Sequence, residues 1–286
     1  MSTRPGYCRP TAVAGLFYPG VRENLACEIA DFLASDPPGS TAVDSFPKAI
    51  IVPHAGYIYS GRIAAKAFSL LTPLRGKIRR VILLGPAHRV AVRGLALPTS
   101  ETFATPLGRV PIDQQSASVI EKFPQIILDD AAHADEHSLE VQIPFLQHVL
   151  GNFLLLPLAV GRVSPEAVAE VLGCLWGGKE TLIVISSDLS HFLSYEAAQT
   201  IDSKTARQIL ALDPTIDPHQ ACGAVAVNGL LLFAQKRGLR AQQLDLCNSG
   251  DTAGDRARVV GYGAFAFFEP EQESEPCQSI RSAKPC

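Results

Sequence analysis

Few residues of this chain are charged, and no stretch of it is strongly basic. Only 19% of the 286 residues are charged and the formal net charge is −3. No run rich in Lys and Arg is flanked by aromatic residues. Such a chain has no broad positive field to attract phosphate backbones, so we expect no nucleic-acid partner.

Long apolar runs, an export signal and paired cysteines are also missing. Gly, Pro or charged residues interrupt every apolar stretch before it reaches the roughly 20 residues that cross a bilayer. Residues 1–10 are followed by no apolar segment of the kind found in signal peptides. The seven cysteines show no CxxC spacing. We therefore expect a cytoplasmic protein with reduced thiols and no membrane partner.

What is present is enough apolar sequence for a large core. Hydrophobic residues make up 47% of the chain, and no composition shift divides it near the middle. We expect one α/β domain over residues 1–268. Residues 269–286 turn polar, which predicts a disordered tail.

Short apolar runs alternate with stretches of helical periodicity, a pattern typical of parallel strands joined by crossover helices. The predicted fold class is therefore α/β, with a mostly parallel sheet flanked by helices. Strands are expected at residues 49–52, 81–84, 94–97, 153–158, 182–185, 243–246 and 259–268. Helices are expected at 62–71, 114–122, 138–149, 165–175, 195–212 and 222–236, with Pro144 kinking or ending the third.

Three histidines come directly after predicted strands. His54, His88 and His191 each follow an apolar run by a few residues. Ligands of parallel α/β sheets bind beyond the carboxyl ends of the strands. A single histidine there is more often structural, but three in the same topological position favour a shared site, because imidazole is a common metal ligand.

Glycines stand close to these histidines in the chain. Gly56, Gly61 and Gly85 are expected to permit tight turns and a close approach of the backbone to a bound group.

Asp188 and Cys222 extend the same set. Asp188 lies three residues before His191 and can ligate a metal or orient a histidine, although a helix N-cap explains it equally well. Cys222 precedes an apolar helix, whose dipole favours the thiolate form of a ligand or nucleophile. Burial as a small apolar residue is the competing interpretation. His137 and Glu140 share a predicted helix face, but this spacing is a weak signal.

Five short segments occur in an order that is typical of one protein family. They are PHAGYIYSG at residues 53–61, LGPAH at 84–88, EHSLE at 136–140, SSDLSH at 186–191 and CG at 222–223. In this order they resemble the Memo family, whose bacterial and archaeal members are named AmmeMemoRadiSam system protein B. The resemblance extends from AVAGLFYP to GYG near the two ends of the chain, and the combination is more specific than any one segment.

The resemblance implies a fold similar to that of class III extradiol dioxygenases, nonhaem iron enzymes that cleave catechol rings. It also implies a metal site whose ligand positions match His54, His88 and Cys222, with Asp188 and His191 lining the same pocket. We expect Asp188 and His191 to be the catalytic residues, which orient ligands or move protons. Fe(II) is the expected ion, with copper or zinc as alternatives. The dioxygenases use two histidines and a glutamate, so Cys222 departs from their ligand set. The bacterial name further implies a functional link to a radical SAM protein and an AMMECR-type protein.

Three functions are consistent with these residues. The first is an iron- or copper-dependent redox protein or dioxygenase-like enzyme. The second is a non-catalytic binding or scaffold protein that receives a peptide or small molecule, with Tyr57 and Tyr59 as recognition surface. The third is a metal-free hydrolase with Cys222 as nucleophile, His191 as base and Asp188 as the orienting group.

Overall fold

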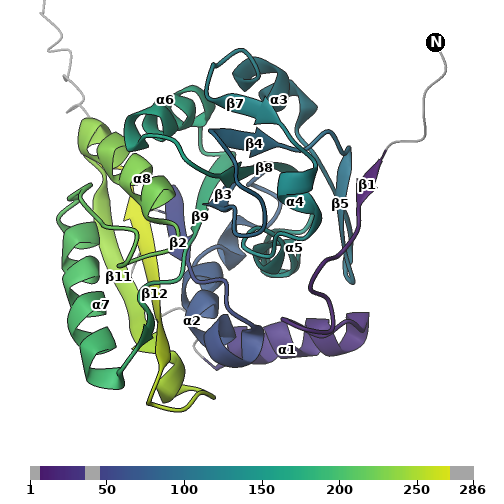
Figure 1. The fold of residues 1–286 in the computed structure, drawn as a ribbon. Helices are drawn as coiled ribbons and strands as arrows, with labels where there is room; N and C mark the ends of the chain where they lie inside the picture. Colours follow the sequence, from purple (N-terminus) through teal and green to yellow (C-terminus); the bar gives the residue numbers. More distant parts are fainter. Residues whose placement is uncertain (1–6, 36–45, 271–286) are drawn as a thin grey trace, which may run out of the picture.

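A nine-stranded sheet runs through the computed structural model, which describes residues 7–35 and 46–270 of the chain. The strand order is β10-β12-β2-β9-β3-β8-β4-β7, and β11 pairs with β12 (Figure 1). The bounds are β2 Ala49–Val52, β3 Arg80–Pro86, β4 Leu95–Leu97, β7 Ile126–Leu128, β8 Leu154–Val160, β9 Thr181–Ser186, β10 His191–Leu193, β11 Arg240–Asn248 and β12 Val259–Phe268.

The centre of the sheet is parallel, and antiparallel pairs join it to both flanks, one of which contains the parallel pair β4 and β7. β2, β9, β3 and β8 are parallel neighbours, whereas β12 joins β2 and β4 joins β8 in antiparallel pairs. Every residue of β2 and β9 is buried, as strands covered on both faces require. The fold is thus the expected α/β class, with a mixed sheet whose core keeps the predicted parallel order.

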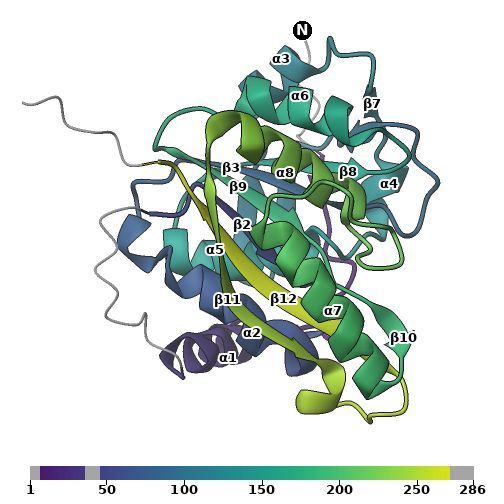
Figure 2. The ribbon, with the colours of Figure 1, turned by 90° about the vertical axis from the view of Figure 1, so that its left-hand side faces the viewer.

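Helices cover both faces of this sheet. One apolar core lies between the sheet and α1 (Arg22–Ala34), α2 (Tyr57–Ser69) and α5 (Ile143–Leu150). The other lies between the sheet and α6 (Pro165–Leu175), α7 (Tyr195–Leu210) and α8 (Ala224–Arg237), which Figure 2 shows from their own side. Alternate residues of β2 supply the two cores: Ile50 and Val52 face one, Ala49 and Ile51 the other.

The remaining elements are short. A separate three-stranded sheet consists of β1, β5 and β6. The bounds are β1 Cys8–Arg9, η1 Thr72–Leu74, β5 Thr102–Thr105, β6 Gly108–Pro111, α3 Gln114–Ile120, α4 Ala131–Ala134, η2 Glu140–Gln142 and η3 Ser249–Asp251.

All seven predicted strands are present, β2 and β12 with the predicted ends and the others with shifted ends. The predicted helices correspond to α2, α3, η2 with α5, α6, α7 and α8. The expectation for Pro144 was wrong. It occupies the first turn of α5, where the missing N–H has no helical partner to lose. The sequence pattern missed α1, because only Leu25 and Ile29 of that helix are buried and its N-cap residue, Val21, caps nothing with its side chain.

Two glycines have roles other than turns. Gly61 lies within α2, and a Cβ there would come within 2.6 Å of Phe32 Cε2, so this glycine lets α1 approach α2 closely. Gly85 lies in β3, where a Cβ would come within 2.8 Å of Ser138 Oγ. The expected turn at Gly61 was therefore wrong, and the close approach at Gly85 involves a protein side chain.

Within the described residues, no helix combines the length and apolar character needed to cross a bilayer. The five described cysteines are free thiols, as expected. Most of the predicted tail, from residue 271, lies outside the described residues together with Cys277 and Cys286. The single-domain boundary at residue 268 stays a prediction.

Candidate metal centre

Three strand ends bring the candidate ligands to one edge of the sheet. His54 lies two residues beyond β2, His88 two residues beyond β3, and Asp188 two residues beyond β9. These strands are direct parallel neighbours, so their carboxyl ends share an edge. Cys222 reaches the same place from the segment before α8.

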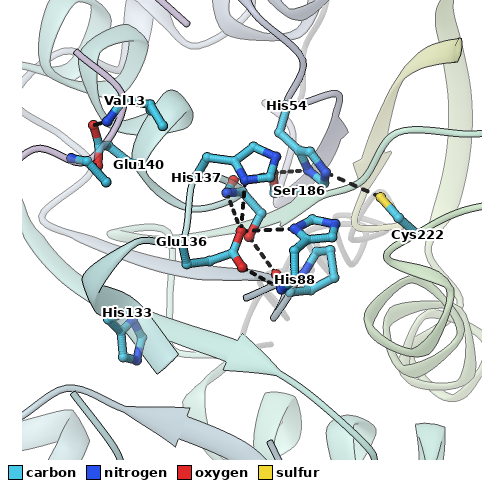
Figure 3. A network of polar contacts seen from close by, with 12 residues as sticks. Val13, His54, His88, His133, Glu136, His137, Glu140, Ser186 and Cys222 are labelled. Carbon is cyan, nitrogen blue, oxygen red and sulfur yellow. Dashed lines mark hydrogen bonds and ion pairs between the residues drawn. The ribbon is translucent and has the colours of Figure 1, made fainter. Parts of the chain in front are cut away.

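The structure brings His54, His88 and Cys222 together. One ligand atom from each lies within 4.8 Å of the others. Cys222 Sγ is 3.2 Å from His54 Nε2, and the His54 and His88 ring centroids are 5.3 Å apart (Figure 3). This group can hold a metal ion. A second group consists of His88, Glu136 and His137, whose ligand atoms also lie within 4.8 Å of one another.

The tautomer of His54 follows from its hydrogen bonds. Ser186 Oγ donates to Ser138 O at 2.6 Å and accepts from Gln142 Nε2 at 2.8 Å. Its only proton is used on Ser138, so the 2.9 Å contact with His54 Nδ1 requires that the imidazole be the donor. The lone pair of His54 is then on Nε2 and points at Cys222. Burial, followed by the charge of the His88 ring, lowers the pKa of His54 to about 3, so the ring is neutral near pH 7.

Glu136 fixes His88 in the same way. Its Oε1 lies 2.9 Å from His88 Nδ1 and accepts from Ser138 N, while its Oε2 accepts from His88 N. Burial by itself would raise the pKa of Glu136, but the hydrogen bonds from His88 and Ser138 outweigh burial and hold the pKa at about 2. The ionised carboxylate holds the proton on Nδ1 and leaves Nε2 of His88 as the ligand atom.

Glu136 was not among the site residues expected from the sequence. No predicted strand precedes it, and its signal was its place beside His137 in the EHSLE segment. Both of its oxygens already accept hydrogen bonds, so the group with Cys222 is the better metal site of the two.

His137 lies against the site without joining this group. Its ring stacks on that of His88 with centroids 4.8 Å apart. The same ring also contacts the Phe17 ring, again with centroids 4.8 Å apart. Its buried Nδ1 has no hydrogen-bond partner in the described part of the chain, although Glu136 Oε1 lies 3.3 Å away. Burial and then the His54 charge lower the pKa of His137 to about 4.

Glu140, which shares the predicted helix face with His137, points elsewhere. Its carboxylate forms a buried ion pair with Arg9 and accepts hydrogen bonds from Ala12 N, Val13 N and Tyr18 Oη. Glu140 therefore anchors the N-terminal segment and contributes nothing directly to the candidate site.

Cys222 is a protonated thiol in this environment. Burial, followed by the charge of Asp188, raises the pKa of Cys222 to about 12. The expectation that the dipole of the following helix would favour the thiolate was wrong, because the sulfur is buried and α8 begins only at Ala224. A metal cation supplies the charge that can displace this proton.

Asp188 and His191 occupy different positions at the site. Asp188 is buried, its Oδ1 accepts from His54 N at 2.7 Å, and its carbonyl accepts from Cys222 N at 3.3 Å. Burial raises the pKa of Asp188, while the His54 N–H and then the His191 charge oppose this rise. His191 is half-buried, and its Nδ1 lies 2.8 Å from Leu189 O, so Nδ1–H donates and Nε2 is left as an acceptor.

The arrangement needed for a metal-free hydrolase is not formed among the described residues. Cys222 Sγ lies within hydrogen-bonding distance of His54 rather than His191, and the Asp188 carboxylate binds a backbone N–H rather than the His191 ring.

Of the two tyrosines expected to form a recognition surface, Tyr57 is not exposed. It is 3% exposed and donates its hydroxyl to Val141 O, whereas Tyr59 is 38% exposed.

Comparisons with known proteins identify related sequences. The family model described as "Memo-like protein" matches residues 9–266. A MEMO1 family protein of Archaeoglobus fulgidus is 35% identical over 91% of this chain and 99% of its own length. A MEMO1 family protein of Aquifex aeolicus is 36% identical, with the same two coverages.

A solved structure supports the fold. The uncharacterized protein JW3007 from Escherichia coli K12 matches with a TM-score of 0.50 and 12% identity, over 76% of this chain and 98% of that one. This likeness concerns the fold alone, and it agrees with the expected dioxygenase-like α/β architecture. The family model and the relatives together show that the chain belongs to the Memo family.

Proposed function

We propose that this Memo-family chain is a metal-dependent redox protein that binds one Fe(II) ion through His54 Nε2, His88 Nε2 and Cys222 Sγ. One observation carries the proposal. One ligand atom from each of the three residues lies within 4.8 Å of the others, and one ring nitrogen of each imidazole is engaged by a neighbouring side chain.

The donor set fits a transition metal. With metal–nitrogen and metal–sulfur bonds of about 2.1 and 2.3 Å, ligand atoms around one ion lie roughly 3.5 Å apart. The 3.2 Å between Cys222 Sγ and His54 Nε2 is close to that spacing. Two imidazoles and a thiolate also suit copper and zinc, which are the alternative ions. Three protein ligands leave room for a further ligand.

The surrounding side chains hold the ligands and provide proton acceptors. Asp188 fixes the backbone of His54, and Glu136 fixes His88. We assign catalytic roles to Asp188 and His191, whose carboxylate and Nε2 are the groups that can take up a proton. Bound Fe(II) would supply one-electron and oxygen chemistry.

Metal content tests the proposal. Protein purified anaerobically without an affinity tag is expected to contain about one metal ion per chain by elemental analysis, because anaerobic handling protects Fe(II) and the thiol. His54→Ala and Cys222→Ser are expected to lose that metal, whereas Cys174→Ser, at an exposed free cysteine, retains it. Full metal content in both site variants would refute the assignment.

Exposed apolar side chains favour a binding or scaffold role as the second candidate. Ile58 and Tyr59, soon after His54, are 67% and 38% exposed, and Phe192, next to His191, is 62% exposed. A peptide or small molecule could contact these side chains while entering the pocket. Retention of a partner by metal-free protein, with loss on Tyr59→Ala, would support this role; dependence on the metal ligands alone would oppose it.

The family resemblance also motivates a functional link to a radical SAM protein and an AMMECR-type protein in the cytoplasm. Co-expression of the three chains followed by size-exclusion chromatography tests a physical link, and cell fractionation tests the compartment. Separate elution of all three would count against a stable complex.

A further inference from the structure

A cavity of about 450 Å³ opens beside Cys222. Its wall is formed by the end of β3, the β3–β4 loop, the residues at the end of β8 and the first turn of α8. This volume is typical of sites for small molecules. A molecule in the cavity would lie next to the sulfur of the His54–His88–Cys222 group.

The lining combines apolar side chains with positive charge. Val90, Val92 and Val225 contribute hydrocarbon surface, Arg93 and Arg162 are the two charged residues of the lining, and none of the described residues that line the cavity is acidic. Neither guanidinium forms an ion pair or a hydrogen bond with any of the residues that the structure describes. Exposed arginines often lack partners, so two unpaired arginines do not by themselves indicate an anion site. The stronger evidence is the backbone structure of the segments that carry them.

The two arginines are carried by segments that are bonded to each other. Arg162 N donates to Val92 O at 2.8 Å, Gly94 N donates to Arg162 O at 3.1 Å, and Gly161 N donates to Gly94 O at 2.9 Å. A Cβ at Gly161 would come within 2.2 Å of Val92 O, so this close pairing requires glycine. The backbone thus holds the two segments that carry Arg93 and Arg162 side by side at one cavity.

The start of α8 adds to the positive potential. Gly223 is the N-cap and provides no side-chain cap, and Val225 and Ala226 line the cavity. Among the described residues, the N–H groups of Val225 and Ala226 have no backbone acceptor. These groups carry the positive end of the helix dipole.

The Glu136 carboxylate lies on another side of the metal centre from Cys222 (Figure 3). Asp188, whose charge acts on Cys222, does not line the cavity, and its Oδ1 accepts from His54 N. Both oxygens of Glu136 are occupied by His88 and Ser138. The arginine-lined cavity is therefore not neutralised by the carboxylate that orients His88.

From this geometry we infer that the cavity binds the substrate of the proposed metal centre, and that the substrate is a small organic acid. Its carboxylate or phosphate lies between Arg93 and Arg162, and its apolar body lies on the valines beside Cys222. Arginine suits both anions because its planar fork can donate two parallel hydrogen bonds. The assignment of this molecule as substrate rests on the proposed metal function, whereas the anion site itself does not.

Binding of simple probes to the full-length protein tests the anion site. Benzoate and phenyl phosphate are titrated by isothermal calorimetry, with benzamide and benzyl alcohol as uncharged analogues. At least one of the two anions is expected to bind about tenfold or more tightly than its uncharged analogue, and the tighter of the two identifies the anionic group. Equal binding of charged and uncharged probes, or no binding of any probe, would overturn the inference.

Charge variants locate the binding. Arg93→Gln and Arg162→Gln are each expected to weaken the anion about tenfold or more, since a hydrogen bond to a charged group is lost. Arg79→Gln is the matched control, because Arg79 is exposed and lies just before the opposite end of β3. An equal loss in Arg79→Gln, or no loss in either cavity variant, would contradict the site.

Cobalt(II) separates this inference from the metal proposal. If the anion lies beside a metal-bound Cys222, benzoate or phenyl phosphate should shift the sulfur-to-cobalt absorption of Co(II)-loaded protein, and the shift should vanish in Arg93→Gln. An unshifted spectrum despite arginine-dependent binding would remove the substrate assignment. Absence of the sulfur-to-cobalt band, with anion binding intact, would instead refute the proposed metal ligand set.

Discussion

At the scale of single residues, the neighbours of each imidazole decide its chemistry. His54 presents Nε2 because Ser186 accepts from its Nδ1, and His88 presents Nε2 because Glu136 does the same. The two histidines could be found in the sequence, since a buried strand precedes each. Glu136 could not be found in that way, because it reaches His88 from a loop 48 positions further along the chain.

Replacing Glu136 tests the role of this carboxylate. Glu136→Gln is expected to weaken metal binding by about 10- to 100-fold, because His88 loses the charged acceptor that fixes its tautomer. Competition with a chromogenic chelator measures the affinity. Asp135→Asn is a matched control, because it removes the same charge from the exposed neighbouring residue. Equal affinities in the two variants would show that Glu136 does not support the ligand.

At the scale of elements, the N-terminal segment is bound to the η2–α5 region through Glu140. Four donors from Arg9, Ala12, Val13 and Tyr18 converge on this carboxylate. The same segment reaches the site, since Phe17 O accepts from Tyr57 N at 2.7 Å and the Phe17 ring contacts His137. The N-terminal segment therefore contacts both Glu140 and residues at the candidate site.

Glu140→Gln is expected to lower the free energy of unfolding by about 3 kcal/mol, because the buried Arg9 guanidinium is left without a charged partner. Urea denaturation of the purified protein measures the change. Glu121→Gln, at an exposed position, is expected to change stability by less than about 0.5 kcal/mol. A similarly small change in the free energy of unfolding for Glu140→Gln would mean that the Arg9–Glu140 ion pair is not needed to hold the N-terminal segment on the η2–α5 region.

The pairing of the β3–β4 loop with the end of β8 leads to a second prediction for the elements, which concerns the stability of a Gly161 variant. Gly161→Ala places a Cβ against the backbone oxygen of Val92, so we expect a loss of about 1–3 kcal/mol in unfolding free energy. Gly20→Ala serves as control, because a Cβ there meets ordinary contacts at 3.4 Å or more. Equal thermal stabilities of the two variants would contradict the close approach.

At the scale of the whole molecule, a buried histidine makes the free energy of unfolding depend on pH. His133 is 1% exposed, its Nε2 is 2.9 Å from Ala96 O, and its Nδ1 has no hydrogen-bond partner among the described residues. Burial lowers the pKa of His133 from 6.5 to about 4. Between these values the unfolded chain binds the proton and the folded chain does not, so stability falls as the pH falls from about 7 towards 4.

With these two pKa values, His133 is expected to remove about 2 kcal/mol of stability between pH 7 and pH 5. Urea unfolding of the wild type and of His133→Gln at both pH values isolates this contribution, because the variant keeps the other buried histidines. The wild type should lose about 2 kcal/mol more than the variant. Equal losses would show that His133 is not the residue that takes up the proton.

The sequence by itself determined the α/β class, the central buried strands and the placement of His54 and His88 after strand ends. Those features depend on local patterns: apolar runs that fit a doubly covered sheet, and polar residues where the runs stop. Only the tertiary structure decided that the sulfur of Cys222 meets an imidazole 168 positions away, that it is a protonated thiol, and that Glu136 orients His88. It also decided that Arg93 and Arg162 line one cavity. Such contacts join distant parts of the chain, and burial and hydrogen bonding at each position are set by the packing of all the elements around it.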